Sequence, residues 1–155
     1  MKNYKGILFQ VGEGAVCNST DWGCYVMESP YIPVATKPKN ISSQSWFDEN
    51  GDDEYIPEVL FYEPVEATIN FVFKGKVADA KTKITAFISY LRDGEFKFYD
   101  EYYNIGRQRV RLLDFSDDAQ FKYSDISKGE GVATFSVVFK INDPVTDITL
   151  RYEGL

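Results

Sequence analysis

Apolar and polar positions alternate most clearly in the middle of the chain, from residue 65 to residue 74. The apolar members lie two residues apart and share one face of an extended chain: Val65, Ala67, Ile69, Phe71 and Phe73. Polar residues occupy most of the positions between them. Because successive side chains of a strand point to opposite faces, this pattern predicts a half-buried β-strand over Val65–Lys74.

The period changes directly after this strand. Apolar residues now recur at the three- and four-residue spacing of one helical stripe: Val77, Ala80, Ile84, Phe87, Ile88 and Leu91. Asp79 lies near the start of this segment and Arg92 near its end, where each charge is favoured by the helix dipole. The pattern predicts an amphipathic helix over Val77–Leu91, with its stripe packed on one face of a sheet.

The remaining periodic segments read as strands. They are Lys5–Val11, Trp22–Glu28, Glu95–Asp100, Ile105–Phe115, Gln120–Ser124, Val132–Ile141 and a short last strand, Asp147–Tyr152. Most connections are too short for parallel crossovers, so we expect antiparallel pairing. The predicted fold class is mainly β with one α-helix. We expect an antiparallel β-sandwich or flattened barrel with a single flanking helix, forming one domain over residues 1–155.

Residues 29 to 57 show no period and carry four prolines, which predicts a long irregular loop. Loops of this length tend to be functional or to be ordered by a partner. Tyr31, Trp46 and Phe47 are its apolar contact points. Its acidic run, Asp48–Glu54, has calcium-type spacing at its first positions, but it lacks the glycine and the final glutamate of such loops. We therefore interpret that run as a solvated turn with Asn50–Gly51 at its tip.

Composition narrows the function. The chain has 155 residues, no histidine, 24 acidic and 17 basic residues, and a net charge of −7. The lack of histidine removes the commonest general base and the commonest metal ligand. Glycoside hydrolysis needs a pair of carboxylates, but any chain with this many acidic residues contains candidate pairs, so their presence is not a specific signal. We therefore expect no enzyme activity, no cofactor and no metal. The acidic balance also argues against tight binding of nucleic acid.

Two cysteines, Cys17 and Cys24, could face each other across a hairpin. The first apolar run, Gly6–Phe9, is too short for a signal peptide or a membrane span. We therefore expect reduced thiols and no association with a membrane.

Two sets of side chains could form a binding surface. Arg107, Arg109 and Arg111 alternate along one predicted strand, so we expect them on one face. They could pair with acidic residues of neighbouring strands or with carboxylates across a subunit interface. Trp22 and Trp46 could instead stack on a sugar, although aromatic residues in alternating strands are more often core.

The order of elements from Val65 to Pro144 resembles the N-terminal domain of phage distal tail proteins and the related tail-tube domain. In that family an alternating strand like Ala67–Phe73 leads into one helix, and an aromatic strand that ends in an acidic residue follows, here Glu95–Asp100. Tyrosines then open the next strand, as Tyr102 and Tyr103 do before Ile105–Leu113. A final strand ends in Asp-Pro, here Asp143-Pro144.

The resemblance implies a structural subunit of a phage or prophage tail, built as a hexameric ring through which DNA passes without specific binding. Its partners would be copies of itself and other tail proteins, with assembly in the cytoplasm and a final location in the virion tail. The interface candidates are Tyr31, Trp46, Phe47, Arg107, Arg109 and Arg111. The alternative is a non-catalytic β-sandwich binding module, carbohydrate-binding through Trp22 or Trp46.

Overall fold

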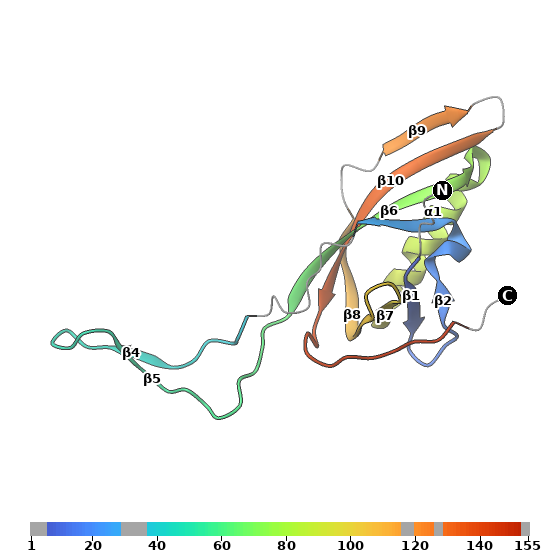
Figure 1. Ribbon diagram of the computed structural model, residues 1–155. Helices are drawn as coiled ribbons and strands as arrows, with labels where there is room; N and C mark the ends of the chain where they lie inside the picture. The colour runs from blue at the N-terminus through green and yellow to red at the C-terminus, as the bar shows by residue number, and fades with distance from the viewer. Residues whose placement is uncertain (1–5, 29–36, 116–119, 126–128, 153–155) are drawn as a thin grey trace.

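The computed structural model describes residues 6–28, 37–115, 120–125 and 129–152. These residues form one curved, eight-stranded sheet, one α-helix and a separate two-stranded hairpin (Figure 1). The strands are β1 (Leu8–Val11), β2 (Cys17–Asn18), β3 (Cys24–Glu28), β4 (Ser43–Ser45), β5 (Asp52–Glu54), β6 (Val65–Lys76), β7 (Phe96–Asp100), β8 (Ile105–Phe115), β9 (Gln120–Asp125) and β10 (Glu130–Ile141). The helix is α1 (Val77–Arg92), and a 3₁₀ turn, η1, spans Ser19–Trp22.

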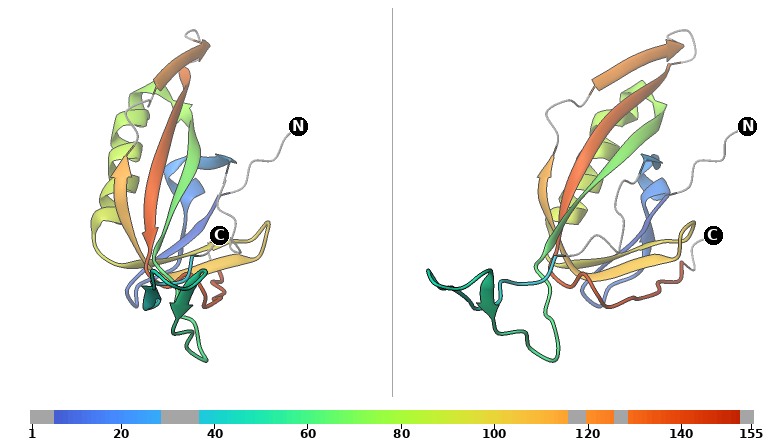
Figure 2. Two further views of the ribbon diagram at one scale, coloured as in Figure 1. Left: turned by 90° about the vertical axis from the view of Figure 1, so that its left-hand side faces the viewer. Right: turned by 60° about the vertical axis from the view of Figure 1, so that its left-hand side comes forward.

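The sheet is antiparallel throughout, in the order β2-β1-β7-β8-β10-β6-β3. Its longest ladder joins β6 to β10, in unbroken register from Val65 opposite Ile141 to Lys76 opposite Glu130. The other edge of β10 is shared, because β8 pairs with its second half and β9 with its first half. The sheet curls around α1, which covers one of its faces (Figure 2).

The core between helix and sheet is built from aromatic rings. Phe87, at the middle of α1, contacts Phe71 of β6 and Phe9 of β1 with ring centroids 5.3 and 5.8 Å apart. Phe71 also stacks on Phe135 of β10 at 5.7 Å. Full burial of one such side chain stabilises the fold by roughly 1.5–3 kcal/mol. The helix therefore holds the curled sheet together through Phe87.

The predicted fold class is confirmed: the described residues are mainly β, antiparallel and curled, with a single α-helix beside the sheet. The alternation from residue 65 also holds. Of the five residues predicted to face inward, Val65 at the strand start is half-buried and the other four are buried. The helix ends one residue later than predicted, at Arg92. The short strand β2 was not predicted.

β8 carries an irregularity that the alternation did not reveal. Arg107 pairs with Phe98 of β7, and Val110 pairs with Phe96. Between these two pairs β8 moves on by three residues while β7 moves on by two. Arg109, inside this step, has a φ of 55°. Such a bulge inserts one extra residue, so Arg107 shares a face with Val110 while Arg111 lies on the other. The predicted placement of Arg107, Arg109 and Arg111 on one face is therefore wrong.

The predicted strand Asp147–Tyr152 is also wrong, because this segment crosses the sheet without forming a ladder. Asp147 accepts a hydrogen bond from Arg107, whose side chain is buried. The amide of Ile148 donates to the carbonyl of Gly106 at 3.4 Å. The backbone at Ile148 comes so close that a Cβ on Gly106 would overlap its carbonyl oxygen. Glycine is thus required at position 106 for the segment to lie where it does.

Beyond this crossing, the segment closes a small second core. Leu150 packs with Leu8 and Tyr99, on the face of the sheet opposite α1. The hydroxyl of Tyr152 donates to a carboxylate oxygen of Asp21 at 2.7 Å. We call the eight-stranded sheet, α1 and this C-terminal segment the body.

Candidate functional site

A long hairpin projects from the body (Figures 1 and 2). It runs from Lys37 to Pro64 and is called the arm here. Near its base the amide of Lys39 donates to the carbonyl of Phe61 at 2.7 Å, and farther out β4 pairs with β5 in antiparallel register. The stretch expected to be an irregular loop at about 29–57 therefore contains a hairpin, which continues past Pro57. Residues 29–36, and with them Tyr31, lie outside the described residues.

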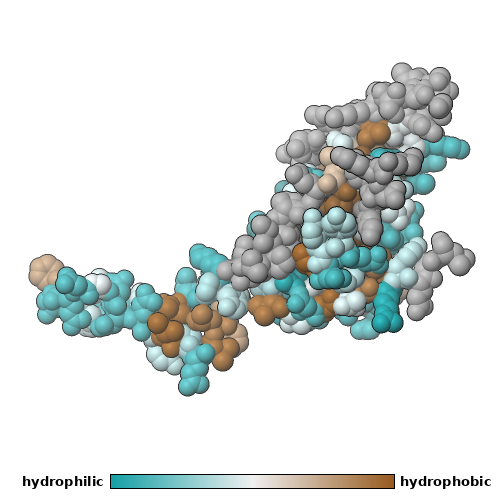
Figure 3. Space-filling view, in the orientation of Figure 1, coloured by the Kyte–Doolittle hydropathy of each residue, from teal (hydrophilic) through white to brown (hydrophobic). Residues whose placement is uncertain are grey.

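Apolar side chains of the arm face outward instead of forming a core. Seven large ones are exposed: Trp46, Phe47, Tyr55, Ile56, Val59, Leu60 and Phe61. Figure 3 shows a cluster of hydrophobic surface along the arm. We call the five from Tyr55 to Phe61 the apolar strip. Contiguous exposed apolar surface of this kind marks an interaction site in a stable protein.

The outer end of the arm is acidic. From Ser43 to Glu54 it carries five carboxylates and no cation: Asp48, Glu49, Asp52, Asp53 and Glu54. All five residues are exposed. Within the described ranges, no group of three or more residues is placed to hold a metal ion. These charges therefore give the arm a negatively charged tip beside two exposed aromatic residues, Trp46 and Phe47.

The predicted interface residues are divided among different parts of the molecule. Trp46 and Phe47 lie together near the tip of the arm, half and fully exposed respectively. Arg107 is buried and bound to Asp147 of the same chain. Arg109 and Arg111 are exposed on β8. The two aromatic residues are therefore exposed together on the arm, whereas the three arginines do not form one surface.

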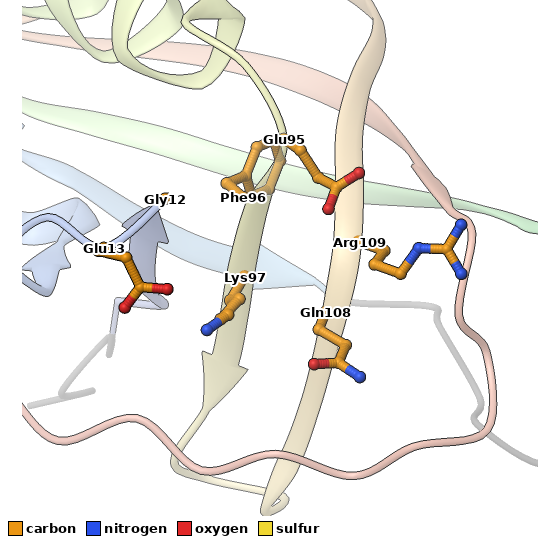
Figure 4. A pocket seen from close by; sticks show the side chains of 7 residues that line it. All are labelled: Gly12, Glu13, Glu95, Phe96, Lys97, Gln108 and Arg109. Carbon is orange, nitrogen blue, oxygen red and sulfur yellow. The ribbon is translucent and has the colours of Figure 1, made fainter.

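Arg109 borders a hollow of about 180 Å³ beside β7 (Figure 4). Its lining is polar and of mixed charge: Gly12, Glu13, Glu95, Phe96, Lys97, Gln108 and Arg109. In Figure 4 the guanidinium of Arg109 points away from Glu13 and Lys97. The side chains do not converge on one point, so the hollow offers no focused binding chemistry.

The two tryptophans have different environments. Trp22 packs on Phe87 and Tyr90, with ring centroids 5.4 and 5.0 Å apart, so it belongs to the core. Trp46 is half exposed on the arm. A sugar-stacking platform could therefore use only Trp46 of the two.

Two titratable groups of the body have strongly perturbed acidity. Burial raises the pKa of the Cys24 thiol to about 12, with a smaller opposing effect of Lys83. Burial is also the main cause that raises the pKa of Tyr90 to about 12. The Tyr90 hydroxyl accepts from the amide of Val11 and donates to the carbonyl of Phe9, at 3.3 and 3.4 Å. It ties α1 to β1, so we interpret it as structural.

The cysteines do not face each other across a hairpin. Cys17 lies on β2 and Cys24 on β3, the strands at the two ends of the sheet order, and both thiols are free. In the described part of the chain, no helix is both long and apolar enough to cross a membrane.

Sequence reasoning missed the apolar strip. The signal was present as an apolar run from Tyr55 to Phe61, but Pro57 and Glu58 interrupt it and no period identifies a face. Only the path of the arm shows that these side chains lack a covering element.

No model of a known protein family matches this chain, and no curated protein matches it. Its fold is similar to that of the Dit protein (gp 19.1) of phage SPP1, described as a paradigm of the adsorption-apparatus hub in phages that infect Gram-positive bacteria. The TM-score is 0.58 at 13% sequence identity, over 92% of this chain and 51% of the Dit chain. This chain therefore spans about half the length of Dit. The likeness shows a shared fold.

Proposed function

We propose that this protein is a non-catalytic structural subunit of a phage or prophage tail, of the distal-tail or tail-tube type. The observation that carries the proposal is the arm, which presents apolar side chains outside a body with a Dit-like fold. The likeness to a phage adsorption hub protein supports a tail role, and the exposed apolar strip supports self-assembly.

The arm needs a partner on physical grounds. An isolated two-stranded hairpin is marginally stable in water. β4 and β5 together contribute three register pairs, and all six of their residues are exposed. A neighbouring subunit would bury the apolar strip and so stabilise the hairpin. An arm that always reaches a different surface of the next copy produces a head-to-tail contact, which closes into a ring when the rotation allows it.

The charge of the chain suits the lumen of such a ring. A net charge of −7 repels the phosphates of DNA, so a wall made from this protein would let DNA pass without binding it. The ring is hexameric in this proposal, its further partners are other tail proteins, and it assembles in the cytoplasm before it becomes part of the virion tail.

The test is removal of the arm. We expect the intact chain to form a large species in size-exclusion chromatography with light scattering. A variant with residues 39–61 replaced by a short Gly-Ser linker should be monomeric, with the melting temperature of the body unchanged. An intact chain that stays monomeric at every concentration would contradict the proposal. A shift of Trp46 fluorescence with sugars in that monomer would favour the carbohydrate-binding alternative.

A further inference from the structure

A second hollow lies on the body, between α1 and the end of β8. Its volume is about 230 Å³, and it is lined by Ile84, Thr85, Ile88, Ser89, Arg92 and Phe115. Ile84, Ile88 and Phe115 give it an apolar floor, while Thr85, Ser89 and Arg92 are exposed. The hollow is open to solvent, so an apolar side chain from another molecule could bury surface against this floor.

The helix beside the hollow is basic, although the protein as a whole is acidic. α1 carries Lys81, Lys83 and Arg92 against one carboxylate, Asp79. Lys81 lies four residues before Thr85 and therefore on the same side of the helix as the hollow. Asp93 follows the helix, and Asp114 precedes Phe115. The Asp114 carboxylate accepts a hydrogen bond from the amide of Phe115. Cations thus stand near both ends of the hollow's helical wall.

The tip of the arm has the complementary chemistry. Phe47 is fully exposed, and Asp48 and Glu49 follow it directly. The arm extends away from the body, so its tip does not lie against the α1 hollow of its own chain (Figures 1 and 2). A second copy can offer that surface.

We propose that Phe47 of one copy occupies the α1 hollow of a second copy, with Asp48 and Glu49 beside Lys81 and Arg92. This inference rests on the proposed function and names the contact through which the subunits join. The aromatic side chain supplies the affinity, as buried aromatic anchors do in protein interfaces. The charged rim is exposed to solvent, so it sets the orientation and the association rate more than the affinity.

The test fills the hollow. Ser89 is exposed and lines the hollow, so Ser89→Trp places a large side chain over the apolar floor without replacing a buried residue. Ala86 is exposed on the same helix but does not line the hollow, so Ala86→Trp is the matched control. Phe47→Ala removes the occupant. We expect Ser89→Trp and Phe47→Ala each to weaken self-association at least tenfold in light scattering over a dilution series. Ala86→Trp should associate as the unmodified protein does.

A mixing experiment makes the test decisive. The Phe47→Ala variant keeps an intact hollow, and the Ser89→Trp variant keeps an intact arm. Mixed together, they should form a one-to-one dimer, although neither associates strongly alone. Normal assembly of both single variants, or a mixture no better than its components, would overturn this contact. If the Phe47 contact were overturned but removal of the arm still gave monomers, the proposed function would stand without this particular contact. Failure of the intact chain to associate at millimolar concentration would overturn both.

Discussion

Two phenylalanines show how differently the arm and the body use apolar side chains. Phe71 of the body is 0% exposed and contacts aromatic rings of two other elements, α1 and β10, whereas Phe47 of the arm is 106% exposed. Burial of the first drives folding of the chain itself. Exposure of the second cannot help the isolated chain, so its contribution comes only when another surface covers it. The body therefore folds around its own core, whereas the arm presents apolar side chains that the partner proposed above would cover.

This contrast means that stability and assembly can be changed separately. The body holds its buried phenylalanines between α1 and the sheet. The two sides of the arm are joined by backbone hydrogen bonds and by an exposed ion pair between Lys37 and Glu63, whose charged atoms lie 3.9 Å apart. Such an exposed pair contributes little.

The largest expected effect is on the body. Phe87→Ala removes the ring on which α1 and the sheet meet, so the free energy of unfolding should fall by about 3–5 kcal/mol. Phe47→Ala, the same substitution on the arm, should change it by less than about 0.5 kcal/mol in the monomer. Urea unfolding of both variants measures the difference. Equal losses would show that the arm shares the stability of the body.

A smaller effect is expected at Gly106. A methyl group there would displace Ile148 and weaken the packing of the C-terminal segment. Gly106→Ala should therefore cost about 1–3 kcal/mol, the usual range for overpacking. The loss should be the same with and without the arm, because the segment lies on the body. Limited proteolysis should detect faster cleavage after Arg151, and unchanged cleavage at that site would contradict this prediction.

The smallest effect concerns pH. Partial burial raises the pKa of Asp143, but hydrogen bonds from Gln108 and from Thr146 and Val145 outweigh it and hold this pKa below its ordinary value of 3.8. The folded state thus binds the proton more weakly than the unfolded state. The resulting stabilisation is complete above the ordinary pKa and is lost as the pH falls through the lowered one.

Asp143→Asn should accordingly flatten part of the acid limb of the stability curve, below about pH 4. Thermal melts of both proteins between pH 6 and pH 2.5 would measure this, again in chains with and without the arm. A wild-type curve with the same acid slope as the variant would show that these hydrogen bonds do not favour the ionised carboxylate.

How far the sequence predicts the molecule depends on whether one face of a segment is buried. β6, α1 and β10 were located within two residues because their apolar side chains all meet one core, and burial fixes the period. The bulge at Arg109 was missed because it depends on the register with β7, which no local pattern encodes. Asp147–Tyr152 does turn Ile148, Leu150 and Tyr152 toward one cluster, yet it pairs with no strand.

Only the aromatic residues of the candidate site could be predicted, because the other parts carry no local burial pattern. Trp46 and Phe47 stand out by residue type alone, so they could be named in advance. β4 and β5 are polar and exposed on every side, and such strands carry no alternation to recognise. The hollow on α1 combines residues from a helix and a distant strand, so it exists only once the two are packed together.

The way in which the arm is connected to the body has a mechanical consequence. Pro64 leads directly into β6, which is hydrogen-bonded to β10 along its whole length. A pull on the arm along the axis of β6 would load this ladder in shear, so its bonds would have to fail together instead of opening one after another. Tension between linked molecules would then be carried into the longest strand pairing of each one.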